Sequence, residues 1–265
     1  MIQIAVAGAA GRMGRAIITV CQSEKGLRIS NAIERAGSDT IGVDAGQLAG
    51  VGNIGVPVGD DINVSPFDVL IEFTNPGATL SHVNYCREQG RAMVIGTTGL
   101  ENSDRKEIEQ AAREISIVFA ANMSIGVNLT LRMLQIAASA LGESVDVEVI
   151  EAHHRHKVDS PSGTALAMGE AVATAWGRNL DDIGVFTRHG QVGPRVDGSI
   201  GFATVRAGDI VGEHTVMFAL EGERVEISHK ASDRMTFANG AIRAARWLSS
   251  RTPGLYDMQD VLGLR

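Results

Sequence analysis

Short apolar runs alternate with helix-forming segments over residues 1–122. The runs have the length and composition of buried β-strands and lie at residues 2–7, 27–33, 68–74, 92–98 and 116–122. The segments between them with helical character lie at residues 12–22, 78–90 and 103–115. Strands that alternate with helices run parallel, so this half of the chain predicts an α/β fold with a doubly wound parallel sheet.

The pattern changes after residue 123. Helical segments are expected at residues 124–142, 163–176 and 236–250, and strands at residues 145–153, 200–207, 210–220 and 224–231. The last three strands follow one another without helices, which indicates antiparallel or mixed pairing. The sequence therefore predicts a second domain of α+β type, built on a mixed sheet.

Two local features carry further expectations. Residues 45–61 contain five glycines and lie inside the first domain, so we expect a long irregular loop with a functional role. Ser103 precedes a strongly helical segment and is expected to cap its N-terminus.

Composition excludes several classes of protein. The 265 residues carry a net charge of -7, which argues against a general nucleic-acid binder, because such proteins gain affinity by neutralising phosphates. No run approaches the ~20 apolar residues of a membrane span, and no signal peptide is visible. Cys21 and Cys86 have no metal or redox spacing. We therefore expect a cytoplasmic protein with no membrane segment and both cysteines in its core.

A glycine-rich loop connects the first strand to the first helix. Gly8, Gly11 and Gly14 stand in the spacing G-x-x-G-x-x-G. In this position such glycines allow a tight turn and a close approach of the backbone to a pyrophosphate, which the N-terminus of the following helix then binds. The prediction is a dinucleotide site, and the alternative is a turn that only packs.

Glu34 ends the second strand about 20 residues beyond the loop, where an acid binds the ribose hydroxyls of NAD. Its neighbour Arg35 could instead meet a 2′-phosphate, so both NADH and NADPH are expected to bind. Two further loops follow the fourth and fifth strands and are expected to line the nicotinamide half. Their candidate residues are Gly96, Thr97, Thr98, Ala120, Ala121 and Asn122.

Five basic or imidazole side chains follow one another at residues 153–157. A metal site would need ligands that converge, but Arg155 and Lys157 oppose a bound cation, and no H-E-x-x-H motif or cysteine partner is present. We therefore predict no metal. A structural histidine remains an alternative for each imidazole taken singly, above all for His156.

A site for a small anion explains the cluster better. Ser162 can cap the helix that follows, and the first N–H groups of that helix, at Gly163 and Thr164, can hold a carboxylate. Lys157 supplies a point charge, and a lysine or histidine there can donate a proton near neutral pH. The predicted partner is a small acidic substrate.

Six segments together resemble one family over nearly the whole chain. They read "VAGAAGRMGR", "IGTTG", "FAAN", "EAHHRHKVDSPSGTA", "GFATVRAGDIVGEHTVMF" and "HKASDRMTFANGA". They are similar to the 4-hydroxy-tetrahydrodipicolinate reductases, also called dihydrodipicolinate reductases, of bacterial lysine and diaminopimelate biosynthesis. The resemblance implies NAD(P)H-dependent reduction of (2S,4S)-4-hydroxy-2,3,4,5-tetrahydrodipicolinate to tetrahydrodipicolinate, with loss of water.

The resemblance also implies an architecture. Residues 1–125 and 235–265 would form a Rossmann dinucleotide-binding domain, and residues 126–234 a domain for substrate binding and oligomerisation in a homotetramer. His153 and Lys157 would be the catalytic pair. Substrate would contact His154, Gly163 and Thr164, with Ser162 and Arg234 as weaker candidates. The residues that would bind NADH or NADPH are Gly8, Ala9, Ala10, Gly11, Arg12, Met13, Glu34, Arg35, Gly96, Thr97, Thr98, Ala120, Ala121, Asn122 and Met123.

Three other functions stay open at this point. Another NAD(P)-dependent imine or amino-acid dehydrogenase would have the same fold and turn over unrelated keto acids. A nucleotide-sensing protein would bind the cofactor without consuming it, but would have no need of clustered proton donors. A metallohydrolase would contain stoichiometric zinc.

Overall fold

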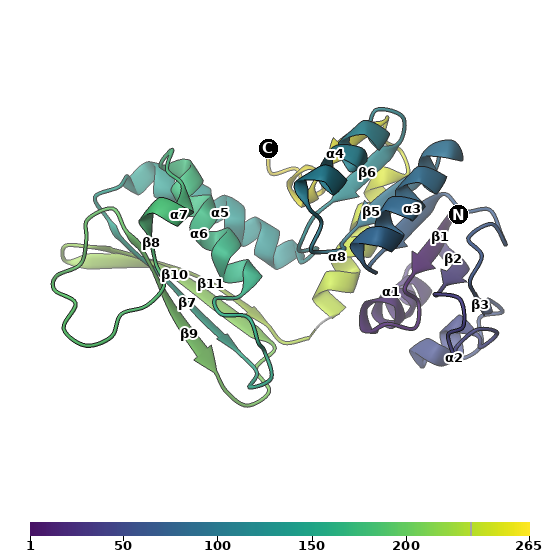
Figure 1. The fold of residues 1–265 in the computed structure, drawn as a ribbon, viewed down its shortest axis with the longest axis horizontal. Coiled ribbons are helices and arrows are strands. Elements are labelled where there is room, and N and C mark those ends of the chain that lie inside the picture. The colour runs from purple at the N-terminus through teal and green to yellow at the C-terminus, as the bar shows by residue number, and fades with distance from the viewer. Residues whose placement is uncertain (234) are drawn as a thin grey trace. The chain divides into compact units, whose positions relative to one another are not determined.

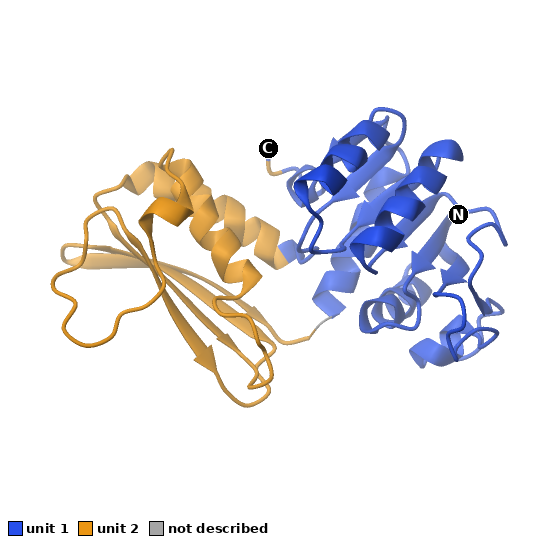
Figure 2. Ribbon diagram, in the orientation of Figure 1, with its two compact units in different colours: residues 1–125, 235–263, 265 blue, residues 126–234, 264 orange. Residues whose placement is uncertain are grey.

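The computed structural model describes residues 1–233 and 235–265. Two compact units divide the chain, as Figure 2 shows. Unit 1 contains Met1–Ile125, Met235–Gly263 and Arg265, and unit 2 contains residues 126–233 and Leu264. Arg234, a predicted substrate contact, lies outside the described residues.

Unit 1 is built on a sheet of parallel strands (Figure 1). Its strands are β1 (Ile2–Ala7), β2 (Leu27–Ile33), β3 (Val58–Gly59), β4 (Val69–Glu72), β5 (Ala92–Ile95), β6 (Ser116–Phe119) and β12 (Gly254–Tyr256). They lie in the order β12-β6-β5-β4-β1-β2-β3, and every described pairing is parallel. The order reverses direction between β1 and β4, which is where ligands bind in such sheets.

Helices cover both faces of this sheet. They are α1 (Arg12–Ser23), α2 (Ala45–Ala49), α3 (Pro76–Glu88), α4 (Asn102–Ala111), α8 (Met235–Leu248) and α9 (Met258–Leu262). Ile17 of α1 and Ala241 of α8 share one apolar core with alternate residues of the strands. Val83 of α3 and Ile108 of α4 share a second core with the intervening strand residues. The predicted doubly wound α/β architecture is confirmed.

Two local expectations in unit 1 were wrong. Residues 45–61 include α2 and β3, because the Asp44 carboxylate accepts hydrogen bonds from N–H groups at both ends of the segment, including Gly46 at 2.9 Å and Val56 at 3.0 Å. Helix α4 is capped by Glu101 in a capping box with Asp104, so Ser103 is not the N-cap.

Unit 2 consists of a mixed sheet with helices packed on one face. Its elements are α5 (Ile125–Leu141), β7 (Asp146–His153), α6 (Gly163–Ala175), α7 (Leu180–Ile183), β8 (Gly184–Val185), β9 (Ile200–Arg206), β10 (Gly212–Leu220) and β11 (Glu223–Ala231). The strands lie in the order β11-β10-β7-β9-β8, antiparallel on one side of β7 and parallel on the other. This confirms the mixed sheet.

The two faces of the second sheet differ in character. Val147 and Val149 of β7 and Phe218 of β10 are fully buried against α5 and α6. Residues of opposite parity, such as Ile150 and Met217, are only half-buried on the other face. Among the described residues, no helix is long and apolar enough to cross a membrane.

Candidate functional site

The glycine loop of unit 1 folds tightly over the end of β1. Gly8 has a φ of +71°, and a Cβ there would lie 3.0 Å from the Phe73 carbonyl oxygen. A Cβ on Gly14 would lie 2.2 Å from the Gly8 carbonyl oxygen. Since no real Cβ tolerates that distance, glycine is required where α1 begins. The helix starts at Arg12 with Gly11 as N-cap and no capping side chain, a geometry that suits a phosphate ligand.

Glu34 joins this loop to the end of β2. Its Oε1 accepts a hydrogen bond from the Ala10 N–H at 3.0 Å. A cavity of about 490 Å³ opens beside it, lined by residues at the ends of β1, β2, β3 and β4 and by residues of α3. These residues include Gly8, Gly11, Glu34, Arg35, Asp60, Phe73, Thr74, Asn75 and His82. The cavity therefore brings together the loop, the acid and the arginine that the sequence assigned to the dinucleotide.

Some of the other predicted cofactor residues have internal roles. A Cβ on Gly96 would lie 2.2 Å from the Phe73 ring, so this glycine makes room for an aromatic wall of the cavity. The Thr97 hydroxyl accepts from Thr79 at 2.9 Å and from the Thr74 N–H at 3.1 Å. Met123 as a whole residue is 1% exposed and belongs to the core. Its burial leaves a ligand almost no surface of Met123 to contact.

The remaining predicted cofactor residues fall into two groups. Ala9 is buried, and Ala10, Met13, Ala120 and Asn122 are half-buried. Arg12, Arg35, Thr98 and Ala121 are exposed, the last two on the loops that follow β5 and β6. The loops after β1, β5 and β6 all begin at the carboxyl edge of one sheet, where dinucleotides bind.

A buried acid at this edge was missed by the sequence reasoning. Glu72 ends β4, is fully buried, and its carboxylate contacts His82 Nδ1 at 2.5 Å and the Thr74 hydroxyl. His82 and Thr74 both line the cavity. The available signal was an acid that ends an otherwise apolar strand.

In unit 2, residues 153–157, which we call the histidine block, do not continue β7 as a strand. Strand β7 ends at His153, and the Lys157 N–H donates to the His154 carbonyl oxygen at 3.1 Å in a turn. Strict alternation would have placed His153 and Lys157 on one face. The turn instead separates a buried His153 from an exposed Arg155 and His156.

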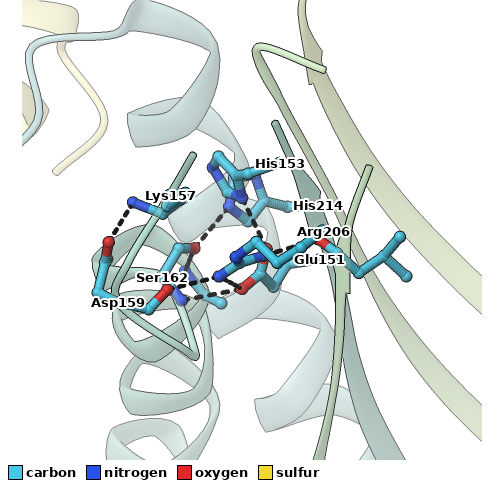
Figure 3. A network of polar contacts seen from close by, with 9 residues as sticks. Glu151, His153, Lys157, Asp159, Ser162, Arg206 and His214 are labelled. Atoms are coloured by element: carbon cyan, nitrogen blue, oxygen red, sulfur yellow. Dashed lines mark hydrogen bonds and ion pairs between the residues drawn. The ribbon is translucent and has the colours of Figure 1, made fainter. Parts of the chain in front are cut away.

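Glu151 is the centre of a polar network on the inward face of β7 (Figure 3). Its side chain is 1% exposed. Arg206 donates from Nη1 to Oε2 at 2.8 Å and from Nη2 to Oε1 at 2.9 Å. The Ser162 N–H donates to Oε1 at 3.0 Å, and His153 Nδ1 lies 2.6 Å from Oε2.

These contacts determine the charge of Glu151. Burial by itself raises the pKa of this carboxyl, but the hydrogen bonds from Arg206, His153 and the Ser162 N–H outweigh it and lower the pKa below its ordinary value. The group is therefore a carboxylate at neutral pH. An ionised carboxylate accepts hydrogen bonds and donates none.

Ser162 and His214 complete the buried part of the network. The Ser162 hydroxyl accepts from the Ala165 N–H at 3.2 Å, which confirms the predicted N-cap of α6. It also lies 3.0 Å from His214 Nε2. Burial, and then the neighbouring His153, lower the pKa of His214 to about 4, so this imidazole is neutral at pH 7.

Lys157 is a more exposed part of the network, with a side chain 22% exposed, and Figure 3 shows it beside Asp159. Its ammonium pairs with the Asp159 carboxylate at 2.8 Å. The hydrogen bond from Lys157 is the main cause that lowers the pKa of Asp159. Arg206 also donates to the Asp159 carbonyl, so one arginine ties the loop after β7 to Glu151. Gly163 is exposed and Thr164 half-exposed at the start of α6.

Glu151, Arg206 and His214 were missed from the sequence. One signal was available: the alternation that points Val147 and Val149 inward also points Glu151 inward, and a buried carboxylate needs partners. Among the described residues, no group of three or more His, Cys, Asp or Glu side chains is arranged to hold a metal ion.

The protein combines a Rossmann-type sheet and its glycine loop with a second unit that buries a carboxylate–histidine pair. Family models match both parts: "Dihydrodipicolinate reductase, N-terminus" over residues 2–123 and "Dihydrodipicolinate reductase, C-terminus" over residues 126–262. Together with the family matches, these structural features identify an NAD(P)H-dependent oxidoreductase. The chain belongs to the dihydrodipicolinate reductase family.

Solved structures share the fold at low sequence identity. A dipicolinate-bound dihydrodipicolinate reductase from Paenisporosarcina sp. TG-14 is 22% identical, with a TM-score of 0.77 and 98% of each chain covered. An amine dehydrogenase from Mycobacterium smegmatis is 14% identical, with a TM-score of 0.63, covering 96% of this chain and 94% of its own. A probable dehydrogenase from Thermotoga maritima is 11% identical, with a TM-score of 0.61, covering 99% and 93%.

Proposed function

We propose that this protein is a 4-hydroxy-tetrahydrodipicolinate reductase of lysine biosynthesis by the diaminopimelate pathway. It reduces (2S,4S)-4-hydroxy-2,3,4,5-tetrahydrodipicolinate to tetrahydrodipicolinate with loss of water. The observation that carries the proposal is the site after β7, which contains a buried histidine, a lysine and the N-terminus of α6. This site lies in the part of the chain that the C-terminal family model matches. Dipicolinate, the ligand named for the similar Paenisporosarcina enzyme, has the same two carboxylates.

The cofactor site is proposed at the glycine loop of unit 1 and the cavity beside it. The loop from Gly8 to Met13 binds the pyrophosphate at the start of α1, because its glycines allow the tight turn and the helix N-terminus carries no capping side chain. Glu34 binds the ribose hydroxyls of NADH, and Arg35 faces the 2′-phosphate of NADPH, so both cofactors are accepted. The loops at residues 96–98 and 120–123 adjoin the nicotinamide, which supplies the hydride.

The chain's own residues provide charge and protons. His154, Gly163 and Thr164 bind substrate carboxylate, with Arg234 as a further contact. Ser162, the other weaker candidate for a substrate contact, is buried with its hydroxyl bound to the Ala165 N–H and near His214, so we assign it the support of the α6 N-terminus. His153 and Lys157 form the acid–base pair, and Lys157 exchanges Asp159 for the substrate when the dicarboxylate binds.

Two wider properties belong to the proposal. The protein is cytoplasmic, and residues 126–234 form the domain that binds substrate and builds a homotetramer. The half-buried outer face of the second sheet, with Ile150 and Met217, supports the tetramer because it offers apolar surface to another subunit. Residues 1–125 and 235–265 serve as the dinucleotide-binding domain.

A coupled assay tests the function. The condensation product of pyruvate and aspartate semialdehyde is supplied, and oxidation of NADH and of NADPH is followed separately. Wild-type protein is expected to consume both cofactors. Lys157→Ala and His153→Ala are expected to bind NADPH normally and to lose turnover by about 100-fold or more, the usual range for an acid–base group.

His189→Ala makes the same kind of change at an exposed residue of unit 2 outside the block and serves as the control. Wild-type turnover in both site variants would contradict the assigned roles. Turnover of unrelated keto acids without the cyclic dicarboxylate would favour an amino-acid dehydrogenase. Cofactor binding without consumption would indicate a sensor.

A further inference from the structure

The hydrogen bonds to the Glu151 carboxylate determine which ring nitrogen of His153 carries a proton. In three of these hydrogen bonds the donor is Arg206, twice, or the Ser162 N–H, and the carboxylate accepts, because guanidinium and backbone N–H groups cannot accept. The fourth contact is His153 Nδ1, 2.6 Å from Oε2. Because the ionised carboxylate can only accept, His153 Nδ1 must carry a proton. Nε2 is then the ring nitrogen through which His153 can exchange a proton with a ligand.

We propose that Glu151 is a positioning residue for His153: its carboxylate holds the imidazole with Nδ1 protonated and leaves Nε2 for the substrate. This assignment deepens the proposed reductase function and rests on it. Arg206 and the N-terminus of α6 keep the carboxylate in place, because each oxygen accepts one bond from Arg206 and one from another group.

Two neighbours lie against the His153 ring. His214 packs edge-on against it, with ring centroids 5.0 Å apart. A Cβ on Gly212 would lie 3.1 Å from His153 Nε2, so a larger residue at 212 would crowd this nitrogen. Among the described residues, Glu151 on β7 and His214 on β10 contact the ring directly. Charged and titratable groups farther out are Arg206 on β9, which binds Glu151, His229 on β11, which pairs with His214, and the ion pair of Lys157 and Asp159 on the loop after β7.

Glu151→Gln gives a sharp prediction about the proton on His153. One of the two carboxylate positions becomes an NH2 group, which must face donors either at Ser162 or at His153. The Ser162 N–H cannot become an acceptor, but an imidazole nitrogen can. We therefore expect the amide NH2 to face His153 and to invert its tautomer, so that Nδ1 accepts and Nε2 carries the proton. Arg206 keeps the carbonyl oxygens of Val205 and Asp159 as partners.

The test is NMR on the full-length protein labelled with ¹⁵N, recorded at a pH where the ring is neutral and without substrate. In wild type the Nδ1 of His153 is expected at the shift of a protonated nitrogen and Nε2 at that of an unprotonated one. Glu151→Gln is expected to exchange the two. A proton on Nε2 in wild type, or no change in the variant, overturns the assignment.

Kinetics separates positioning from a structural role. In Glu151→Gln we expect kcat to fall about 100-fold or more, as for a wrong histidine tautomer at a catalytic site, with the Kd for NADPH unchanged. Glu143→Gln, which alters an arginine-paired glutamate outside the network, should change neither quantity. Wild-type kcat in Glu151→Gln, with the tautomer inverted, also overturns the proposal.

Failure of the reductase function is distinguishable from failure of this inference. If wild type does not consume NAD(P)H with the dicarboxylate but the tautomer inverts, the function is wrong and the hold of Glu151 on His153 is supported. If Glu151→Gln does not fold, Glu151→Asp provides the second variant. Its shorter carboxylate should keep the Nδ1 proton, and loss of that proton would overturn the proposal.

Discussion

Acid should weaken unit 2 through His214. This imidazole is 4% exposed, and its Nδ1 has no hydrogen-bond partner among the described residues. Its pKa is lowered from 6.5 to about 4. The unfolded chain therefore takes up the proton first as the pH falls, so the contribution of His214 to stability is complete above pH 6.5 and is lost between pH 6.5 and 4. The difference amounts to about 3 kcal/mol.

Urea unfolding of wild type and His214→Gln measures this contribution. Trp176, whose indole N–H donates to the Ala138 carbonyl oxygen at 3.1 Å, reports on unit 2 by fluorescence in a Trp247→Phe background. Between pH 7 and 4 the wild type should lose about 3 kcal/mol more of its free energy of unfolding than the variant. Glu151 is present in both proteins and largely cancels. Parallel losses in the two proteins would refute the reasoning.

Three further outcomes are expected. Gly14→Ala places a methyl group against the Gly8 carbonyl oxygen, so titration with NADPH should show at least roughly tenfold weaker binding, and unchanged affinity would count against the glycine loop as the cofactor site. Asp159→Asn removes the anion that pairs with Lys157, so calorimetry should show dipicolinate binding up to about fivefold tighter; weaker binding would speak against displacement. Glu34→Gln keeps an acceptor for the glycine loop but removes a charge, which should shift the ratio of Kd values toward NADPH by about tenfold, whereas an equal effect on NADH and NADPH would exclude this role.

The five longer strands of the first sheet could be predicted from their apolar runs, whereas the short β3 and β12 were not predicted. Parallel strands buried on both faces read as apolar runs, and every run in residues 1–122 became a strand. The segment 45–61 was harder, since Asp44 organises it by accepting from N–H groups up to 12 residues away. Such a contact leaves no periodic pattern.

The candidate site likewise combines residues that are close in sequence with residues that only the fold brings together. His153, Lys157 and Ser162 are close in sequence and could be found as one basic segment. Arg206 meets Glu151 from 55 residues away, and His214 meets Ser162 from 52 residues away. Neighbouring strands create these contacts, so the pairing of β7 with β9 and β10 had to be known first.

Transfer of deuterium tests the central claim most directly. NADH and NADPH carrying deuterium at the reactive position of the nicotinamide are supplied with the condensation product of pyruvate and aspartate semialdehyde, and the product is examined by mass spectrometry. Wild type is expected to form tetrahydrodipicolinate that contains one deuterium for each cofactor oxidised, whereas Lys157→Ala forms almost none. Product without deuterium, or a labelled cofactor that stays reduced, would contradict the account.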